Sequence, residues 1–116
     1  MSESEKVIMG KLETIKHIHK VRALLVKMIE ELDKRAIAHD QSKLESPEKE
    51  VFGEYTPELA KTEYGSPEYD ALLTKVKPAI DHHYAKNRHH PEHWPHGIND
   101  MTLIDLIEML CDWKAA

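Results

Sequence analysis

The chain is poor in cysteine, in surplus positive charge and in long apolar segments, and each shortage excludes a class of protein. A single cysteine, Cys111, cannot form an internal disulfide framework and indicates a reducing, cytoplasmic setting. The net charge of -5 leaves no excess of cations for binding a nucleic-acid backbone. No apolar run is long enough to span a bilayer, and we expect no signal peptide. Strand-like alternation, internal repeats and linkers are also missing.

Histidine, by contrast, is abundant. The 116 residues include nine histidines, six of them between His82 and His96. An affinity tag would be monotonous and terminal, and this tract is neither. Hydrophobic residues at 41% and charged residues at 32% are typical of a soluble globular protein, and the length predicts a single domain over residues 1–116.

Helical periodicity dominates the chain. Apolar side chains recur at three- and four-residue steps over residues 5–35, which predicts one long first helix. A short second helix is expected over residues 36–44. The run Ser46-Pro47-Glu48 then predicts a third helix that ends before Thr56-Pro57. The sequence thus begins as a series of helices joined by short turns.

The second half continues in the same way. A fourth helix is expected from Ser66 to Lys86, kinked or divided at Pro78. Residues 87–101 read as loop, and Thr102 caps a final helix. The predicted fold class is all-α, a compact bundle of about five helices.

Histidine and aspartate are spread over four of these elements in a way that favours a metal site. Imidazole nitrogen and carboxylate oxygen are ligands for divalent metals. His39 and Asp40 are adjacent, and neighbouring residues on a helix can share one ion only at a helix end or bend, which the break at Pro47 provides. The other candidates lie on the first helix (His17 or His19), between His82 and His93, and on the last helix (Asp112).

The doublet His39–Asp40, with Lys43 after it and Asp112 on the last helix, resembles the HD superfamily of metal-dependent phosphohydrolases. The resemblance implies an HD-domain-like bundle and a further ligand on the first helix, His17 or His19. We prefer His17, because the superfamily's ligand histidine is typically followed four residues later by an apolar residue, here Val21.

Two other likenesses are carried by the histidine tract. The stretch "NRHHPEHWPHG" is similar to the paired-histidine segment of the cyclic-dinucleotide phosphodiesterase branch, but Trp94-Pro95-His96-Gly97 replaces that branch's Gly-Tyr-Pro signature. The runs "KHIHKV", "HDQSKL", "HHYAKNRHHPEHW" and "IEMLCDW" resemble a family of short uncharacterised bacterial and phage proteins. That second likeness supports the fold and supplies no activity.

Each candidate has a specific expected role. His83 continues the line of Leu72, Val76 and Ile80, so it faces inward, while His89 and His90 follow the helix end. Asn87 and Arg88 are expected to contact a substrate. The predicted metal ligands are His17, His39, Asp40, His83, His89, His90 and Asp112. Asp40 and Lys43 are the predicted catalytic residues, Lys43 also meeting a substrate phosphate, and Glu108 is the candidate supporting carboxylate.

Plainer interpretations stay open for these residues. His39 and Asp40 could be a polar pair at a helix end, and Lys43 could be a solvated lysine. Four of the histidines could each be a surface residue: His82, His89, His93 and His96. Trp94 and Trp113 are expected to pack rather than to stack on a base.

The combined expectation is a metal-dependent phosphohydrolase acting on a nucleotide or related phosphoester through a metal-activated water, with one or two divalent ions per chain (Mn, Fe, Co, Ni, Zn or Mg). One alternative is a di-iron oxygenase of the same fold. Another is a non-catalytic, metal-stabilised accessory protein of a phage or bacterium. We also expect a small-molecule substrate, no membrane partner, and a homodimer as an option for the long first helix.

Overall fold

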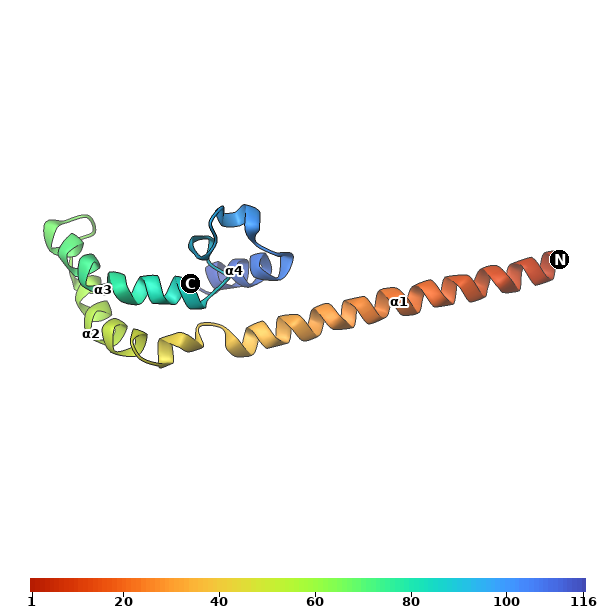
Figure 1. The fold of residues 1–116 in the computed structure, drawn as a ribbon, viewed down its shortest axis with the longest axis horizontal. Helices are drawn as coiled ribbons and strands as arrows, with labels where there is room; N and C mark the ends of the chain where they lie inside the picture. The colour runs from red at the N-terminus through yellow and green to blue at the C-terminus, as the bar shows by residue number, and fades with distance from the viewer. The chain divides into compact units, whose positions relative to one another are not determined.

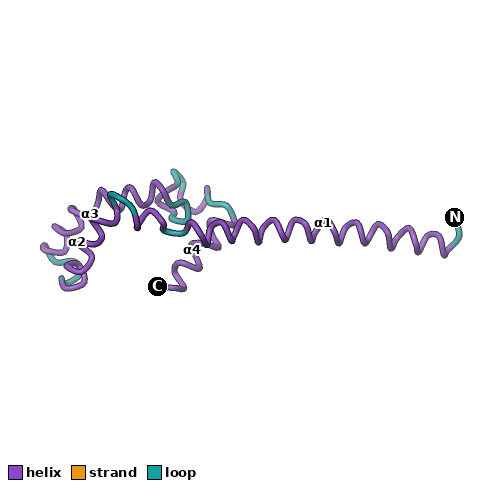
Figure 2. Tube along the Cα trace, turned by 90° about the horizontal axis from the view of Figure 1, so that it is seen from below, coloured by secondary structure: helices purple, strands orange, loops and turns teal.

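The computed structural model describes residues 1–116 and consists of helices, turns and short loops, with no strand (Figures 1 and 2). The four α-helices are α1 (Glu3–Ala38), α2 (Glu48–Lys61), α3 (Pro67–Lys86) and α4 (Leu103–Ala115). Three short 3₁₀ turns lie between them: η1 (Gln41–Leu44), η2 (Pro91–His93) and η3 (Gly97–Asp100). The all-α prediction is confirmed, with four α-helices where about five were expected. None of these helices is both long and apolar enough to cross a membrane.

The chain divides into two units, Met1–Arg35 and Ala36–Ala116. The first unit is a stretch of α1, and α1 contains no buried residue. Its apolar residues shift around the helix, from Ile8 and Leu12 near the start to Leu25 and Leu32 near the end, so no single straight face collects them. The prediction of a compact bundle that includes this helix is therefore wrong.

Helix α1 ends at Ala38, and the polar doublet follows directly. Asp40 has a left-handed backbone conformation (φ 52°), which an aspartate tolerates better than most residues and which stops the helix. A 3₁₀ turn, η1, then replaces the α-helix expected over residues 36–44. A helix does end near the doublet, but it is the first helix, and it ends at Ala38, before the doublet rather than after it.

Helix α2 is longer than predicted. It continues through Thr56 and Pro57 to Lys61, where the sequence suggested an end before the proline. Ser46 does not cap it: Pro47 occupies the N-cap position, and the Ser46 hydroxyl donates to the Glu50 carboxylate instead. Helices α2 and α3 pack side by side, and this packing holds the first turn of α2 against α3 (Figures 1 and 2).

Helices α3 and α4 begin at the predicted signals. Ser66 caps α3 through the backbone N–H of Tyr69, and α3 runs without a break past Pro78. Thr102 and Asp105 form a reciprocal capping box at the start of α4. Residues 87–101, expected as loop, contain the two turns η2 and η3.

The buried residues of the Ala36–Ala116 unit are polar or charged about as often as they are apolar. Its buried apolar residues are Val76, Ala79, Met101 and Met109. Its buried polar or charged residues are Glu48, His83, Asn87, His89 and Asp105. Burying ionisable groups is unfavourable unless they are paired or bind an ion. The fold therefore surrounds a polar cluster rather than a large apolar core.

Candidate metal centre

Six of the predicted ligands come together within the Ala36–Ala116 unit. His39 and Asp40 follow the end of α1, His83 lies near the end of α3, and Asp112 lies near the end of α4. His89 and His90 precede η2. They form two groups whose ligand atoms lie within 4.8 Å of one another. Group A is His39, Asp40, His89 and Asp112, and group B is Asp40, His83, His89 and His90.

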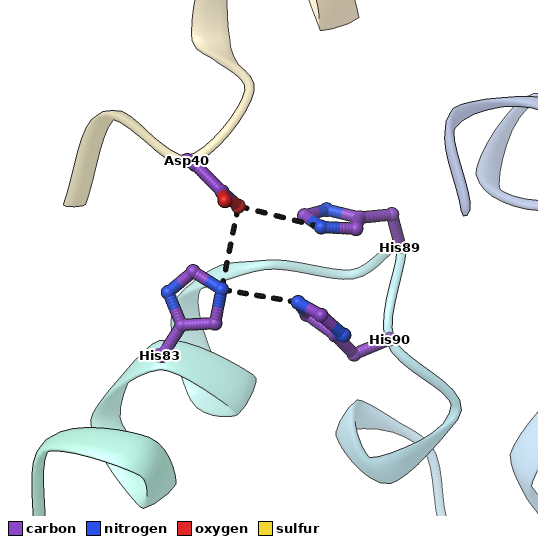
Figure 3. A group of neighbouring side chains, drawn as sticks. All are labelled: Asp40, His83, His89 and His90. Atoms are coloured by element: carbon purple, nitrogen blue, oxygen red, sulfur yellow. Dashed lines mark hydrogen bonds and ion pairs between the residues drawn. The ribbon is translucent and has the colours of Figure 1, made fainter. Parts of the chain in front are cut away.

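Group B is the set drawn in Figure 3. The Nε2 atoms of His83 and His90 are 3.0 Å apart. Asp40 Oδ1 lies 3.3 Å from His83 Nε2 and 3.4 Å from His89 Nε2. The side chains of His83, His89 and His90 therefore turn toward a common point beside the Asp40 carboxylate.

Group A lies on the other side of the same carboxylate. His39 Nε2 is 3.6 Å from Asp40 Oδ2 and 3.5 Å from Asp112 Oδ1. His89 Nε2 is 3.6 Å from Asp112 Oδ2. The two oxygens of Asp40 thus face different groups, Oδ1 toward group B and Oδ2 toward His39. The His89 imidazole presents a single Nε2 lone pair, so it can serve only one of the two groups at a time.

Two carboxylates hold the other nitrogen of three of these imidazoles. Glu108 Oε2 lies 2.8 Å from Nδ1 of both His39 and His89. Glu48 Oε1 lies 2.6 Å from His83 Nδ1. A carboxylate at Nδ1 accepts its proton, which assigns the lone pair to Nε2. This is the usual way in which a protein orients a metal-binding histidine.

The Nε2 atoms and the aspartate oxygens therefore face one another as acceptors. Asp40 Oδ1 and His89 Nε2 are buried and have no hydrogen-bond partner. A buried acceptor without a partner is unfavourable by about 1–3 kcal/mol. A cation between such acceptors would remove this penalty for all of them together.

The spacing also fits an ion. Two ligand atoms that each lie ~2.1 Å from one ion are separated by roughly 3.0–3.5 Å at octahedral to tetrahedral angles. Six separations between group members are 3.0 Å to 3.6 Å, close to that interval, and all ligand atoms of each group lie within 4.8 Å of one another. The residues present thus suit divalent ions in donor type, protonation state and spacing.

The electrostatics of the centre are mixed. Burial alone would raise the pKa of Asp40, but the hydrogen bond and charge of Lys43 and the nearby imidazoles bring the pKa below its usual value. Burial lowers the pKa of His89 and of His90, and neighbouring histidines lower both further. These two imidazoles are therefore neutral at neutral pH, the form in which they ligate metals.

His39 behaves differently. Burial would lower its pKa, but the Glu108 hydrogen bond and the charges of Asp40, Glu108 and Asp112 together raise the pKa above its ordinary value. The surplus of carboxylates around His39 attracts positive charge, whether it arrives as a proton or as a metal ion.

The predicted ligand on the first helix is not in this cluster. His17 lies in the Met1–Arg35 unit, and both His17 and the alternative His19 are exposed. Its assignment stays a prediction made from the HD resemblance. His89 occupies the place in group A that the HD resemblance assigns to His17.

Three predicted substrate-contacting residues have contacts of their own. Lys43 Nζ lies 3.1 Å from Asp40 Oδ2 and lines a pocket beside His83 and His90. Asn87 is buried and donates to Ser42 Oγ at 2.9 Å and to the His83 carbonyl at 2.9 Å. The Arg88 guanidinium binds both oxygens of Asp105. Lys43 lies at the edge of the centre, and Asn87 Nδ2 is also 3.3 Å from Nδ1 of the ligand His83. Substrate contact by Asn87 and Arg88 stays a prediction.

Glu48 is the functional residue that the sequence did not reveal. It has no exposed surface, and its two oxygens contact Nδ1 of His82 and of His83, each at 2.6 Å. Burial would raise its pKa, but the hydrogen bonds from Ser42, His82 and His83 bring the pKa below its usual value. In the sequence it was only an acid in the first turn of a helix, where acids are common.

Comparison with known proteins gives one result. A family model described as a family of unknown function, DUF5662, matches residues 8–116. The chain belongs to the DUF5662 family. No curated protein and no solved structure matches it. The match covers every residue of both groups in this DUF5662 protein, while the family description names no activity, so function must be argued from the centre itself.

Proposed function

We propose that this protein is a metal-dependent phosphohydrolase that cleaves a small phosphoester, with two divalent ions in groups A and B. The observation that carries the proposal is the shared Asp40 carboxylate, whose two oxygens face two sets of imidazole and carboxylate ligands. Paired metal ions that share a carboxylate are suited to holding the oxygens of a phosphoryl group.

His39, Asp40 and Asp112 would hold one ion, and His83, His90 and the other oxygen of Asp40 would hold the second, with His89 completing either set. When bound, the metal supplies an acidified water as nucleophile at neutral pH and neutralises charge on the phosphoryl oxygens. Imidazole and carboxylate together accept several first-row metals, so the ligand set does not select one.

Lys43 has a role of its own. Its ammonium contacts Asp40 and also lines the adjoining pocket, at the boundary between ligands and substrate space. A cation there is attracted to a phosphate in the pocket and offsets the negative charge that builds up as the ester bond breaks. Water attacks phosphorus and gives up a proton, the bond from phosphorus to the ester oxygen breaks, and the departing alkoxide takes up a proton, so the products are an alcohol and inorganic phosphate.

The test uses the full chain, freed of metal and reloaded with Mn²⁺. Metal content and hydrolysis of a panel of phosphomonoesters and nucleotides are measured for the wild type and for Asp40→Asn, Asp112→Asn and His90→Ala. We expect two ions in the wild type, one after loss of Asp112 or His90, and a rate lower by about 100-fold or more in all three variants. His96→Ala is the matched control, because His96 is an exposed histidine of the same tract and contacts Asp100 instead of the centre.

Three outcomes would contradict the proposal. Hydrolysis that is unchanged in Asp40→Asn would remove the centre from the reaction. Iron loading with consumption of dioxygen, and no hydrolysis, would favour the oxygenase. Metal-dependent stabilisation with no turnover of any ester would favour a non-catalytic accessory protein.

A further inference from the structure

A pocket adjoins group B and is built by α2, α3 and the segments that carry the ligands. Its volume is about 430 Å³. Two of its lining residues, His83 and His90, are members of group B, and the others are Lys43, Phe52, Thr56, Ile80 and Tyr84. One end of the pocket is therefore the proposed metal centre, and the remainder is available to whatever is attached to a bound phosphoryl group.

The walls beyond the ligands are mainly apolar. Phe52 is half-buried and stands edge-on to the His83 ring, with 6.3 Å between ring centroids. The ring centroids of Tyr84 and His90 are 5.0 Å apart. Ile80 lies one helical turn before Tyr84 on α3. Such walls favour an uncharged, partly apolar group.

Charge and size limit the ligand further. Lys43 is the one lysine or arginine that lines the pocket. The nearby Arg88 guanidinium is paired with the buried Asp105. One ammonium suits one phosphate better than a chain of three. A pocket of about 430 Å³ is at the small end of ligand sites, which span roughly 300–1,000 Å³.

We infer that this pocket selects phosphomonoesters with a single compact, uncharged organic group, preferably a ring that packs between Phe52 and Tyr84. This inference rests on the proposed function for the position of the phosphoryl group. The pocket should therefore accept simple phosphomonoesters and exclude nucleoside triphosphates and linked dinucleotides, which carry more charge and more volume than the pocket accommodates.

The test compares two phosphonates, whose carbon–phosphorus bond resists hydrolysis. Binding of phenylphosphonate and of methylphosphonate to the Mn²⁺-loaded full chain is measured by calorimetry. We expect phenylphosphonate to bind about tenfold more tightly or better, because only its ring is removed from water by the pocket walls. Equal affinities would overturn the inference, and so would failure of the loaded protein to bind either compound.

Two variants locate the effect. Thr56 is an exposed residue that lines the pocket, so Thr56→Tyr should fill the space and bring the two affinities within about twofold. Phe52→Leu should reduce the preference partly. Thr74→Tyr, at an exposed threonine of α3 outside the pocket, should keep the wild-type preference. A preference that survives in Thr56→Tyr would show that the ring binds elsewhere.

The two proposals fail in different ways. Ring selectivity in binding, without turnover of phenyl phosphate, would contradict the phosphohydrolase and leave the pocket assignment standing. Turnover of phenyl phosphate with no ring selectivity in binding would contradict the pocket assignment and leave the phosphohydrolase standing. Turnover of a triphosphate more efficient than that of its monophosphate would also overturn the pocket assignment.

Discussion

At the scale of single residues, the centre depends on which atom of each histidine carries the proton. Glu108 and Glu48 accept from Nδ1 of His39, His89 and His83, which leaves the Nε2 lone pairs facing the aspartates. Acceptors that face acceptors across 3.3 Å to 3.6 Å are stable only with something positive between them. This arrangement is the physical basis for the two proposed ions.

Glu108 supports two ligands through one oxygen, and its removal should weaken metal binding. We predict that Glu108→Ala lowers the affinity for Mn²⁺ by about 10- to 100-fold, because His39 and His89 lose the acceptor that fixes their rings. Glu108→Gln, which keeps one acceptor oxygen, should recover part of the loss. Calorimetric titration of the metal-free protein measures the affinity. A merely structural role predicts lower stability of the metal-free protein with unchanged affinity.

Acid should destabilise the metal-free protein through His90. Burial, followed by the charges of His89 and His83, lowers its pKa, so the folded form stays neutral where the unfolded chain, with a pKa near 6.5, is already protonated. The unfolded state then binds more protons, and stability falls as the pH drops below 6.5 toward the lowered pKa. His39, whose pKa is raised, acts in the opposite sense: its contribution is present below 6.5 and is lost as the pH rises above it.

Urea unfolding in a metal chelator at pH 7.5 and pH 5.5 checks this. The loss of stability on acidification should be smaller in His90→Asn than in the wild type. His39→Asn should show a larger loss. His96→Asn, at an exposed histidine, should match the wild type. If His90→Asn lost as much stability on acidification as the wild type, His90 would not titrate as described.

Much of the centre was predictable from residue type and order. His39–Asp40, His83, His90 and Asp112 are potential ligands whose positions at helix ends or on an inward face can be read from the periodicity. Glu48 was not predictable, because its partners are chosen by the packing of α2 on α3 and not by spacing along the chain. For the same reason the sequence did not predict that the side chains of Asn87 and Arg88 would contact Ser42 and Asp105.

At the scale of the elements, the end of α1 is the decisive feature. A regular helix would place His39 and Asp40 about 100° apart, but the left-handed Asp40 and the turn η1 let both contribute to group A. The sequence predicted a helix end after this doublet, at the break before Pro47. It did not predict that α2 would continue through Pro57, since a proline within a helix is normally a breaker and only packing keeps the helix going.

The apolar stripe of α1 needs a covering surface. Leu25 is 59% exposed on this helix, and helices gain most of their stability by packing an amphipathic face. We predict that Leu25→Asp lowers the melting temperature of the helical signal in circular dichroism more than Lys27→Asp, which introduces the same residue on the opposite side of the helix. Equal decreases in melting temperature for the two substitutions would mean that the apolar stripe of α1 remains exposed to solvent.

A second copy of the chain is the partner that the sequence suggested for this helix. Light scattering of the same samples tests it. A dimer in the wild type and in Lys27→Asp, with a monomer in Leu25→Asp, is the expected result. A monomer throughout would contradict it.

At the scale of the whole molecule, the chain is all-helical, and its Ala36–Ala116 unit surrounds an ionisable cluster with little apolar core. The helices could be predicted because their periodicity and start signals are local, as at Ser66 and Thr102. The prediction of a compact bundle was wrong, because the apolar stripe of α1 does not keep to one face and no local sequence signal specifies a surface that covers it. The central proposal therefore concerns the cluster: two adjacent metal ions would share the Asp40 carboxylate.

An anomalous difference map from a crystal of the full chain grown with Mn²⁺ tests this claim most directly. We expect two peaks roughly 3.5–4 Å apart on either side of the Asp40 carboxylate, one beside Asp112 and one beside His83 and His90. A map with no peak at Asp40, or with manganese bound only elsewhere on the chain, would contradict it.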